Sequence, residues 1–436
     1  KRQVHDYAHI GNFRAYVFED LLRRTFRYAG FRVTQVQNLT DVDDKTIRKS
    51  RAAGLTLDAY TRRFKEAFFE DLQTLRIEPA EVYPAATEHI PEMIALIQRL
   101  IERGFAYRSE DGSVYFSIER FPAYGRLAHL DRAALKPGAR VAQDEYEKEN
   151  VGDFALWKAW TPDDGDVAWD SPWGRGRPGW HIECSAMSMK YLGESFDVHC
   201  GGVDNIFPHH EDEIAQSEAA TGKPFVRYWL HCAHLMVDGR KMSKSLGNFY
   251  TLRDVLARGY TGREVRFVLI GGHYRQPLNF TWASMESARA GLRRLDDFVA
   301  RMNEIAAGTS PGALPQWATA RDAAFTAALE EDLNLPNALA ALFDLVHDGH
   351  RAADAAALAP AQAAAVRQLL DRWDRVLGIV EREDEALPPE IAELVRAREA
   401  ARKARQWTEA DRLREALKVR GWSVQDTPKG SKVRRL

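Results

Sequence analysis

GWHIECSAMSMKYLGESFDVHCGGVDNIFPHHEDE, residues 179–213, brings thiol, imidazole and carboxylate side chains together at the spacing of a metal site. The polar start and Ala-rich continuation of PHHEDEIAQSEAA predict a helix, which would place His209 and Glu213 on one face. With Cys184 as the soft ligand, this N/S/O set suits Zn2+ with an exchangeable position, as in catalytic zinc sites. The alternative is a small buried thiol beside a capped, solvated helix start, since the CxxC pairs of structural zinc are absent.

The residues between these candidate ligands favour a nucleotide. In HCGGVDN, Gly201 and Gly202 follow the β-like run FDVH, and a glycine pair there permits close approach of a ligand to the backbone. Asp204 then offers a carboxylate to a ribose hydroxyl. The stretch therefore predicts a metal site beside a nucleotide site.

Length and composition set the general class. A chain of 436 residues with 45% apolar residues predicts two to four folded units with real cores. No run of eighteen apolar residues and no signal-peptide pattern occurs, so no membrane or export segment is expected. Three cysteines form no disulfide framework, which favours a reducing, cytoplasmic compartment. The net charge is −2, but Lys and Arg outnumber Asp and Glu after residue 396, as an anionic partner would require.

Two short motifs lie far from the central stretch. HIGN, residues 9–12, comes just before a periodic helix, where its amides and imidazole would hold phosphates; a helix-capping loop is the alternative. KMSKS, residues 241–245, predicts a mobile loop with two ammonium groups suited to a phosphoryl transition state. A solvated basic loop is the alternative for this motif.

The remaining pattern predicts how the chain is organised. Phe31–Asn38 alternates as a strand and ends in the acidic turn NLTDVDDK, at the strand end where open α/β sheets bind ligands. Helices are expected at 57–76 and 91–103, and the turn-rich residues 106–173 at an insertion with its termini close together. A bundle of three to five helices, a break at 381–389, and a basic helical hairpin leading to a short strand and basic tail complete the chain.

The joint occurrence of HIGN and KMSKS, in this order, resembles the class I aminoacyl-tRNA synthetases. Within that class the chain resembles the cysteinyl-tRNA synthetase family over essentially its whole length. The segments that carry this resemblance are NLTDVDDK, GWHIECSAM, GGVDNIFPHHEDEIAQSEA, KMSKSLGNF, HYRQPLNF and DTPKGS.

The resemblance implies a role for particular residues. One zinc ion per chain would bind the substrate thiol, held by Cys184, His209, Glu213 and an N-terminal cysteine that is absent from this sequence. The cysteine pocket would contain Thr40, Trp180 and His199. Catalytic residues would be His9, Asn12, Lys241 and Lys244. Mg2+ with ATP would be bound by His9, Gly11, Asn12, Gly202, Asp204 and Lys244.

The resemblance also implies the activity: ATP-dependent activation of L-cysteine and its transfer to the 3' end of tRNA(Cys), by a cytoplasmic monomer that does not bind membranes. The alternatives are a cysteine ligase of mycothiol biosynthesis, which acts on an amino sugar, and a non-catalytic tRNA-binding paralogue. The basic C-terminal module favours tRNA over a sugar.

The implied fold is a Rossmann-like α/β catalytic domain with an insertion, an all-α bundle and a small anticodon-binding module. The expected divisions are 1–105 with 174–240 for the catalytic halves, 106–173 for the insertion, 241–285 for the signature loop and stem contacts, 286–380 for the bundle and 390–436 for the module.

Overall fold

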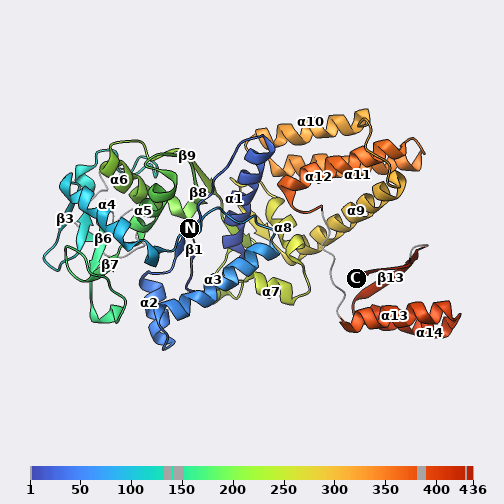
Figure 1. Cartoon of the computed structure of the whole chain (residues 1–436), viewed down its shortest axis with the longest axis horizontal. Helices are drawn as coiled ribbons and strands as arrows, with labels where there is room; N and C mark the ends of the chain where they lie inside the picture. Colours follow the sequence, from blue (N-terminus) through green and yellow to red (C-terminus); the bar gives the residue numbers. More distant parts are fainter. Residues whose placement is uncertain (1, 132–139, 142–151, 381–388, 428–429, 436) are drawn as a thin grey trace. The chain divides into compact units, whose positions relative to one another are not determined.

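The computed structural model describes residues 2–131, 140–141, 152–380, 389–427 and 430–435. They divide into two compact units, residues 1–381 and 382–436, and each is described by itself (Figure 1). Most of the predicted break at 381–389, together with Pro428 and Lys429 of DTPKGS, lies outside the described residues. Over the part of the chain that is described, no helix has the length and apolar character needed to cross a bilayer.

Helix α1, Ile10–Tyr28, opens the first unit and packs one face into its main core. Phe13, Val17 and Leu21 recur every four residues and are all buried, as the apolar stripe of an amphipathic helix. The N-terminal end of α1 therefore has a fixed position at the surface of this core.

The strand predicted at Phe31–Asn38 is wrong. This segment is extended, but within the described residues it forms an isolated parallel bridge, from Val36 to Val82, rather than a ladder. The next backbone bond runs from Leu39 N–H to the carbonyl of Pro84 (2.8 Å). Because proline has no backbone N–H, Pro84 cannot donate a hydrogen bond to the neighbouring segment, and a regular ladder cannot form there.

Parallel strand pairs confirm the predicted Rossmann-like α/β class. Strand β8, Phe196–Gly202, pairs in parallel with β9, Val226–Cys232, and α6, Glu211–Thr221, makes the crossover between them. Parallel neighbours need such a crossover because the chain leaves the first strand at one end of the sheet and must enter the second strand at the opposite end. β1 (Arg2–Gln3) also pairs in parallel with β2 (Leu39–Thr40), and β10 (Leu235–Val237) pairs in parallel with β12 (Leu278–Phe280). Antiparallel β11 (Arg240–Lys241) flanks β10.

The region predicted as an insertion forms a second, mainly antiparallel sheet, which continues beyond residue 173. Its strands are β3 (Ala106–Arg108), β4 (Val114–Phe116), β6 (Asp153–Ala159) and β7 (Gly176–Pro178), with β5 (Arg140–Val141) parallel to β6. Phe116 and Phe154 stack at 5.0 Å in a core separate from that of α1. This second core also contains Ile182 of α5 and Ala215 of α6, so the insertion is packed directly against the helices of residues 179–213.

The remaining helices of the catalytic region fill the space around these strands. They are α2 (Asp44–Ala52), α3 (Leu57–Thr74), α4 (Ile90–Glu102), α5 (Trp180–Leu192), α7 (Leu252–Ala257) and α8 (Gly262–Ile270).

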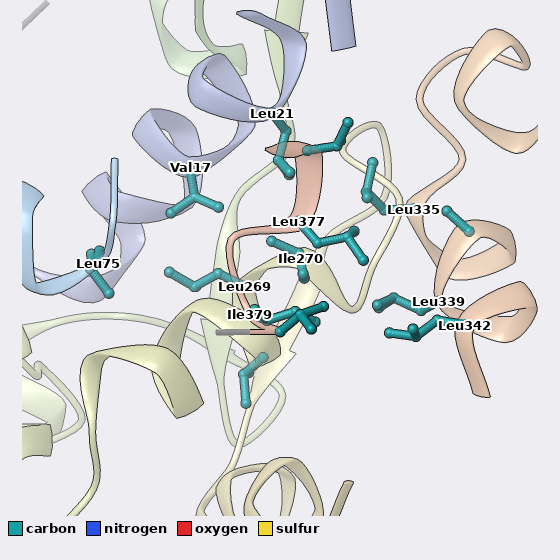
Figure 2. Close-up of a cluster of buried hydrophobic side chains, with 14 of the residues drawn as sticks. Val17, Leu21, Leu75, Leu269, Ile270, Leu335, Leu339, Leu342, Leu377 and Ile379 are labelled. Carbon is teal, nitrogen blue, oxygen red and sulfur yellow. The ribbon is translucent and has the colours of Figure 1, made fainter. Parts of the chain in front are cut away.

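A four-helix bundle shares the main core with α1. Its helices are α9 (Trp282–Ala306), α10 (Gln316–Glu330), α11 (Leu335–Asp354) and α12 (Pro360–Leu377). Figure 2 shows the junction, where Val17 of α1, Ile270 of α8 and Leu377 of α12 belong to one buried cluster. The bundle and the helix that carries HIGN are therefore parts of one packed body.

The second unit is a helical hairpin followed by a strand hairpin. Its elements are α13 (Pro389–Lys403), α14 (Trp407–Val419), β13 (Trp422–Thr427) and β14 (Gly430–Arg435). Arg398 is 2% exposed, and its Nη1 and Nη2 donate to the two carboxylate oxygens of Asp426 at 2.8 and 2.9 Å. This bidentate pair fastens the strand hairpin to α13.

Candidate functional site

The HIGN motif forms the first turn of α1 rather than a loop before it. His9 is the N-cap: its Nδ1 accepts from Asn12 N–H (3.2 Å), and His9 N–H donates to Asn12 Oδ1 (3.2 Å). This reciprocal capping box satisfies two end groups of the helix. No acidic residue lies in the first turn, so the positive end of the helix dipole stays available to an anion such as phosphate.

The structure brings KMSKS next to HIGN. Ile10 N–H donates to the carbonyl of Tyr250 (3.0 Å), and the ring of Phe249 lies edge-on to His9, with centroids 5.1 Å apart. A Cβ at Gly11 would lie 2.9 Å from Cε of Met242, so a larger residue would displace the end of the Met242 side chain. Lys241 at the end of β11 is exposed, and Lys244 begins a short 3-10 turn. HIGN and KMSKS, which are about 230 residues apart in the sequence, therefore lie next to each other in the fold.

The glycine pair at the end of β8 has two different structural roles. A Cβ at Gly201 would lie 2.8 Å from both Nδ2 of Asn205 and the imidazole carbon Cε1 of His210, so the lack of a side chain at this glycine gives space to these two neighbours. A Cβ at Gly202 would collide with the carboxylate of Asp204, which lies in the 3-10 helix Val203–Asn205. The Asp204 carboxylate therefore lies against the carboxyl end of β8.

Cys184, His209 and Glu213 are buried together. Their ligand atoms all lie within 4.8 Å of one another. Cys184 comes from α5, Glu213 from the first turn of α6, and His209 from the π turn Ile206–His210 that leads into α6. The predicted helix included His209, but the observed α6 begins only at Glu211. His209 Nε2 nevertheless lies 2.6 Å from Oε1 of Glu213, as the four-residue spacing predicts.

The chemistry of this cluster fits zinc. Thiolate, imidazole and carboxylate are its usual ligands, and three converging protein donors leave a position for a substrate. Burial would raise the pKa of Glu213, but the imidazoles of His199 and His209 lower it well below its ordinary value. The carboxylate is therefore ionised at neutral pH. His199 Nε2 binds the other carboxylate oxygen at 2.7 Å.

Further imidazole side chains surround the cluster. His199 stacks on Trp229, with centroids 4.8 Å apart, and His210 Nδ1 lies 2.8 Å from Nε2 of His231. Burial, with a contribution from His199, lowers the pKa of His231 to about 4 and that of His210 well below its ordinary value. His199, His210 and Glu213 also form a second close group of possible ligand atoms.

The sequence analysis did not predict a buried series of side-chain contacts that runs from His209 to His181 and Asp212. His181 Nδ1 lies 2.9 Å from His209 Nδ1, and His181 Nε2 lies 3.3 Å from Oδ2 of Asp212. The signal was present in the spacing, because His181 precedes Cys184 by three residues and Asp212 follows His209 by three. Such spacing puts each pair on one side of a helix.

The predicted cysteine pocket is brought together in part. Trp180, the first residue of α5, lies over His209 with ring centroids 4.6 Å apart. Cys184 and His199 line a cavity of about 830 Å3, whose walls also include Asn38. Thr40 is fully buried, and its Oγ1 accepts from Nδ2 of Asn38 at 3.3 Å. The contacts described for Thr40 connect it to this cavity through Asn38.

Family models cover nearly the whole chain. The tRNA synthetases class I (C) catalytic domain matches residues 2–290, and the DALR domain matches residues 324–381. The cysteinyl-tRNA ligase anticodon binding domain matches residues 384–434.

Named relatives match at high identity. A cysteine–tRNA ligase of Protochlamydia amoebophila is 50% identical over 437 residues, covering 99% of this chain and 91% of the relative. One of Chlamydia pneumoniae is 51% identical, covering 99% and 92%. Among solved structures, a Mycobacterium tuberculosis methionyl-tRNA synthetase in complex with methionyl-adenylate has a TM-score of 0.62 at 16% identity, covering 87% of this chain and 88% of that one. At this identity the last likeness concerns the fold alone.

Proposed function

The chain belongs to the cysteine–tRNA ligases of the class I aminoacyl-tRNA synthetases, and from this membership we propose that it selects L-cysteine through zinc, activates it with ATP and transfers it to tRNA(Cys). The observation that carries the zinc proposal is the buried cluster of Cys184, His209 and Glu213. Cys184 of this cluster and the neighbouring His199 also line a cavity of about 830 Å3.

Selection of cysteine requires more than the shape of a pocket. Serine differs from cysteine by one atom, and an apolar pocket separates such pairs only weakly. Bound zinc would supply a soft Lewis acid that favours a thiolate over an alkyl hydroxyl. Cys184, His209 and Glu213 would hold it, with the N-terminal cysteine implied by the family. Trp180, Thr40 and His199 are proposed to line the remainder of the substrate pocket.

Activation would proceed by in-line displacement at the α-phosphorus of Mg-ATP. A cysteine carboxylate oxygen forms a bond to phosphorus as the bond to the pyrophosphate oxygen breaks, which yields cysteinyl-adenylate and pyrophosphate. His9, Gly11 and Asn12 at the start of α1 would bind the phosphates, and Lys241 and Lys244 would stabilise the charge that accumulates in the transition state.

On the ribose side, Gly202 and Asp204 at the end of β8 would bind the adenosine. In the second step, a hydroxyl of the terminal ribose of the tRNA attacks the carbonyl carbon. The new ester forms, the bond to AMP breaks, and the hydroxyl proton is released. No covalent enzyme intermediate is needed.

The C-terminal parts favour tRNA over an amino sugar as the acceptor. Residues 384–434 match an anticodon-binding domain, and this segment is rich in Arg and Lys, as an RNA-binding surface requires. We propose residues 286–380 as the tRNA stem-binding bundle and 390–436 as the anticodon reader.

Replacement of Cys184 by serine tests this function, with Cys232→Ser as the matched control. Cys232 is also buried, but its Sγ lies 3.8 Å from the carbonyl of Arg14, away from the cluster. Cys184→Ser should lose bound zinc and the preference for cysteine over serine in tRNA charging, and Cys232→Ser should retain both. Stoichiometric zinc with full charging in Cys184→Ser would refute the assignment. Ligation of cysteine to an amino sugar, without tRNA charging, would support the alternative.

A further inference from the structure

We propose that Asp212 and His181 are positioning residues that keep His209 in the tautomer able to bind a metal. The inference rests on the proposed zinc site and adds to it the device that prepares one of its ligands. Asp212, His181 and His209 are 0%, 2% and 1% exposed, so bulk water does not set their proton positions.

The contacts favour one arrangement of protons. A carboxylate only accepts, so the approach of His181 Nε2 to Asp212 Oδ2 (3.3 Å) is favourable when this nitrogen carries its proton. In neutral His181 the other nitrogen, Nδ1, is then an acceptor. The 2.9 Å contact between the two Nδ1 atoms therefore requires His209 Nδ1–H as the donor. The lone pair of His209 is thereby left on Nε2, which lies 2.6 Å from Oε1 of Glu213.

The opposite tautomer is a real competitor at this site. Its proton would lie on His209 Nε2 and would donate to Oε1 of Glu213, 2.6 Å away. That hydrogen bond would occupy two metal ligands at once. It would also force His181 to donate from Nδ1 and to present a bare Nε2 to the Asp212 carboxylate, which is repulsive. The charge of Asp212 thus biases the whole chain of contacts toward the metal-binding form.

The insertion holds Asp212 in place. Tyr124, from the insertion, donates its hydroxyl to Oδ1 of Asp212 at 2.6 Å. Next to it, Glu211 accepts from the backbone N–H groups of Gly125 (2.7 Å) and Ala128 (2.8 Å). Two consecutive acidic residues of α6 therefore anchor the same loop. Through this anchoring, the insertion fixes the rotamer of the Asp212 carboxylate, on which the contacts with His181 and His209 depend.

Three substitutions separate this positioning role from simple packing. Asp212→Asn keeps the shape but can donate to His181 Nε2, which permits the opposite tautomer. His181→Leu removes the acceptor for His209 Nδ1–H, whereas His181→Asn offers Oδ1 near the position of the lost Nδ1. His89→Leu is the control, because His89 is also a buried histidine with both ring nitrogens bonded, to the Ala85 carbonyl and Tyr191 hydroxyl.

The measurement is the zinc affinity of the full-length protein, obtained by competition with a chelator, together with the visible spectrum of the Co2+-substituted protein. Asp212→Asn and His181→Leu should bind zinc about 10- to 100-fold more weakly and show altered cobalt bands, the usual scale for loss of a group that orients a metal ligand. His181→Asn should recover most of the affinity, and His89→Leu should match the wild type.

The proposal is overturned if Asp212→Asn binds zinc as tightly as the wild type, or if His181→Asn loses as much as His181→Leu. An equal loss in His89→Leu would reduce the effect to packing and overturn it too. These results leave the proposed function intact. Absence of Cys184-dependent zinc binding in the wild type would instead overturn both proposals.

Discussion

Replacement of Arg266 by methionine should destabilise the first unit by about 4 kcal/mol. Arg266, on α8, and Asp20, on α1, have fully buried side chains, and Arg266 Nη2 lies 2.7 Å from Oδ2 of Asp20. The guanidinium also donates to the carbonyls of Leu377 (2.7 Å), Leu75 (3.0 Å) and Arg76 (3.2 Å). Methionine has a similar length and leaves every one of these acceptors without this donor.

The magnitude follows from these bonds. Each neutral hydrogen bond contributes about 1 kcal/mol and a bond to a charged partner about 1.5–3 kcal/mol. Arg24 Nε still binds Asp20 at 2.8 Å, which offsets part of the loss. The expected loss of about 4 kcal/mol agrees with the cost of about 3–5 kcal/mol for removing one partner of a buried ion pair. Water cannot easily replace the donor, because Leu75, Leu377 and Leu269 belong to the buried apolar cluster at this junction (Figure 2).

Urea unfolding followed by far-UV circular dichroism measures this loss. Arg62→Met is the control with the same chemical change, because the side chain of Arg62 is 65% exposed and pairs with Asp58 on the helix surface. Its cost should stay below about 1 kcal/mol. Equal shifts of the unfolding midpoint for the two variants would refute the reasoning that burial gives the Arg266 pair its importance.

Two further predictions concern the tRNA and the pH. Truncation after Leu387 removes nearly all of the second unit, so cysteine-dependent pyrophosphate exchange should persist while tRNA charging falls; equal loss of both would contradict a separate anticodon module. The pKa of His231 is lowered to about 4, so the unfolded chain takes up this proton first and stability should fall as the pH drops from about 6.5 toward 4. Allowing for partial solvent access, the loss at pH 5 should be about 1 kcal/mol. It is measured as the difference in urea midpoints between pH 7.5 and 5, and an unchanged pH dependence in His231→Asn would contradict the assignment.

The spacing of residues in the sequence was sufficient to predict which side chains lie together where a local repeat fixes the geometry. His209 and Glu213 are four residues apart, and the turn that leads from the π turn into α6 brings their side chains together. The periodicity after HIGN likewise predicted the helix that is observed as α1. The strand predicted at Phe31–Asn38 failed for a non-local reason: its partner segment contains Pro84, which cannot return a ladder bond.

By itself, the sequence determined the α/β class, the helical C-terminal parts and the residue types of the candidate metal site, because helical period and donor chemistry are properties of short segments. Only the tertiary structure decided that Met242 packs against Gly11, that His210 lies against Gly201, and that Asp212 lies next to His181. These contacts join α1 to the signature loop, β8 to the π turn before α6, and α6 to α5. The physical reason is that each depends on how separate elements pack, which a pattern along one segment does not contain.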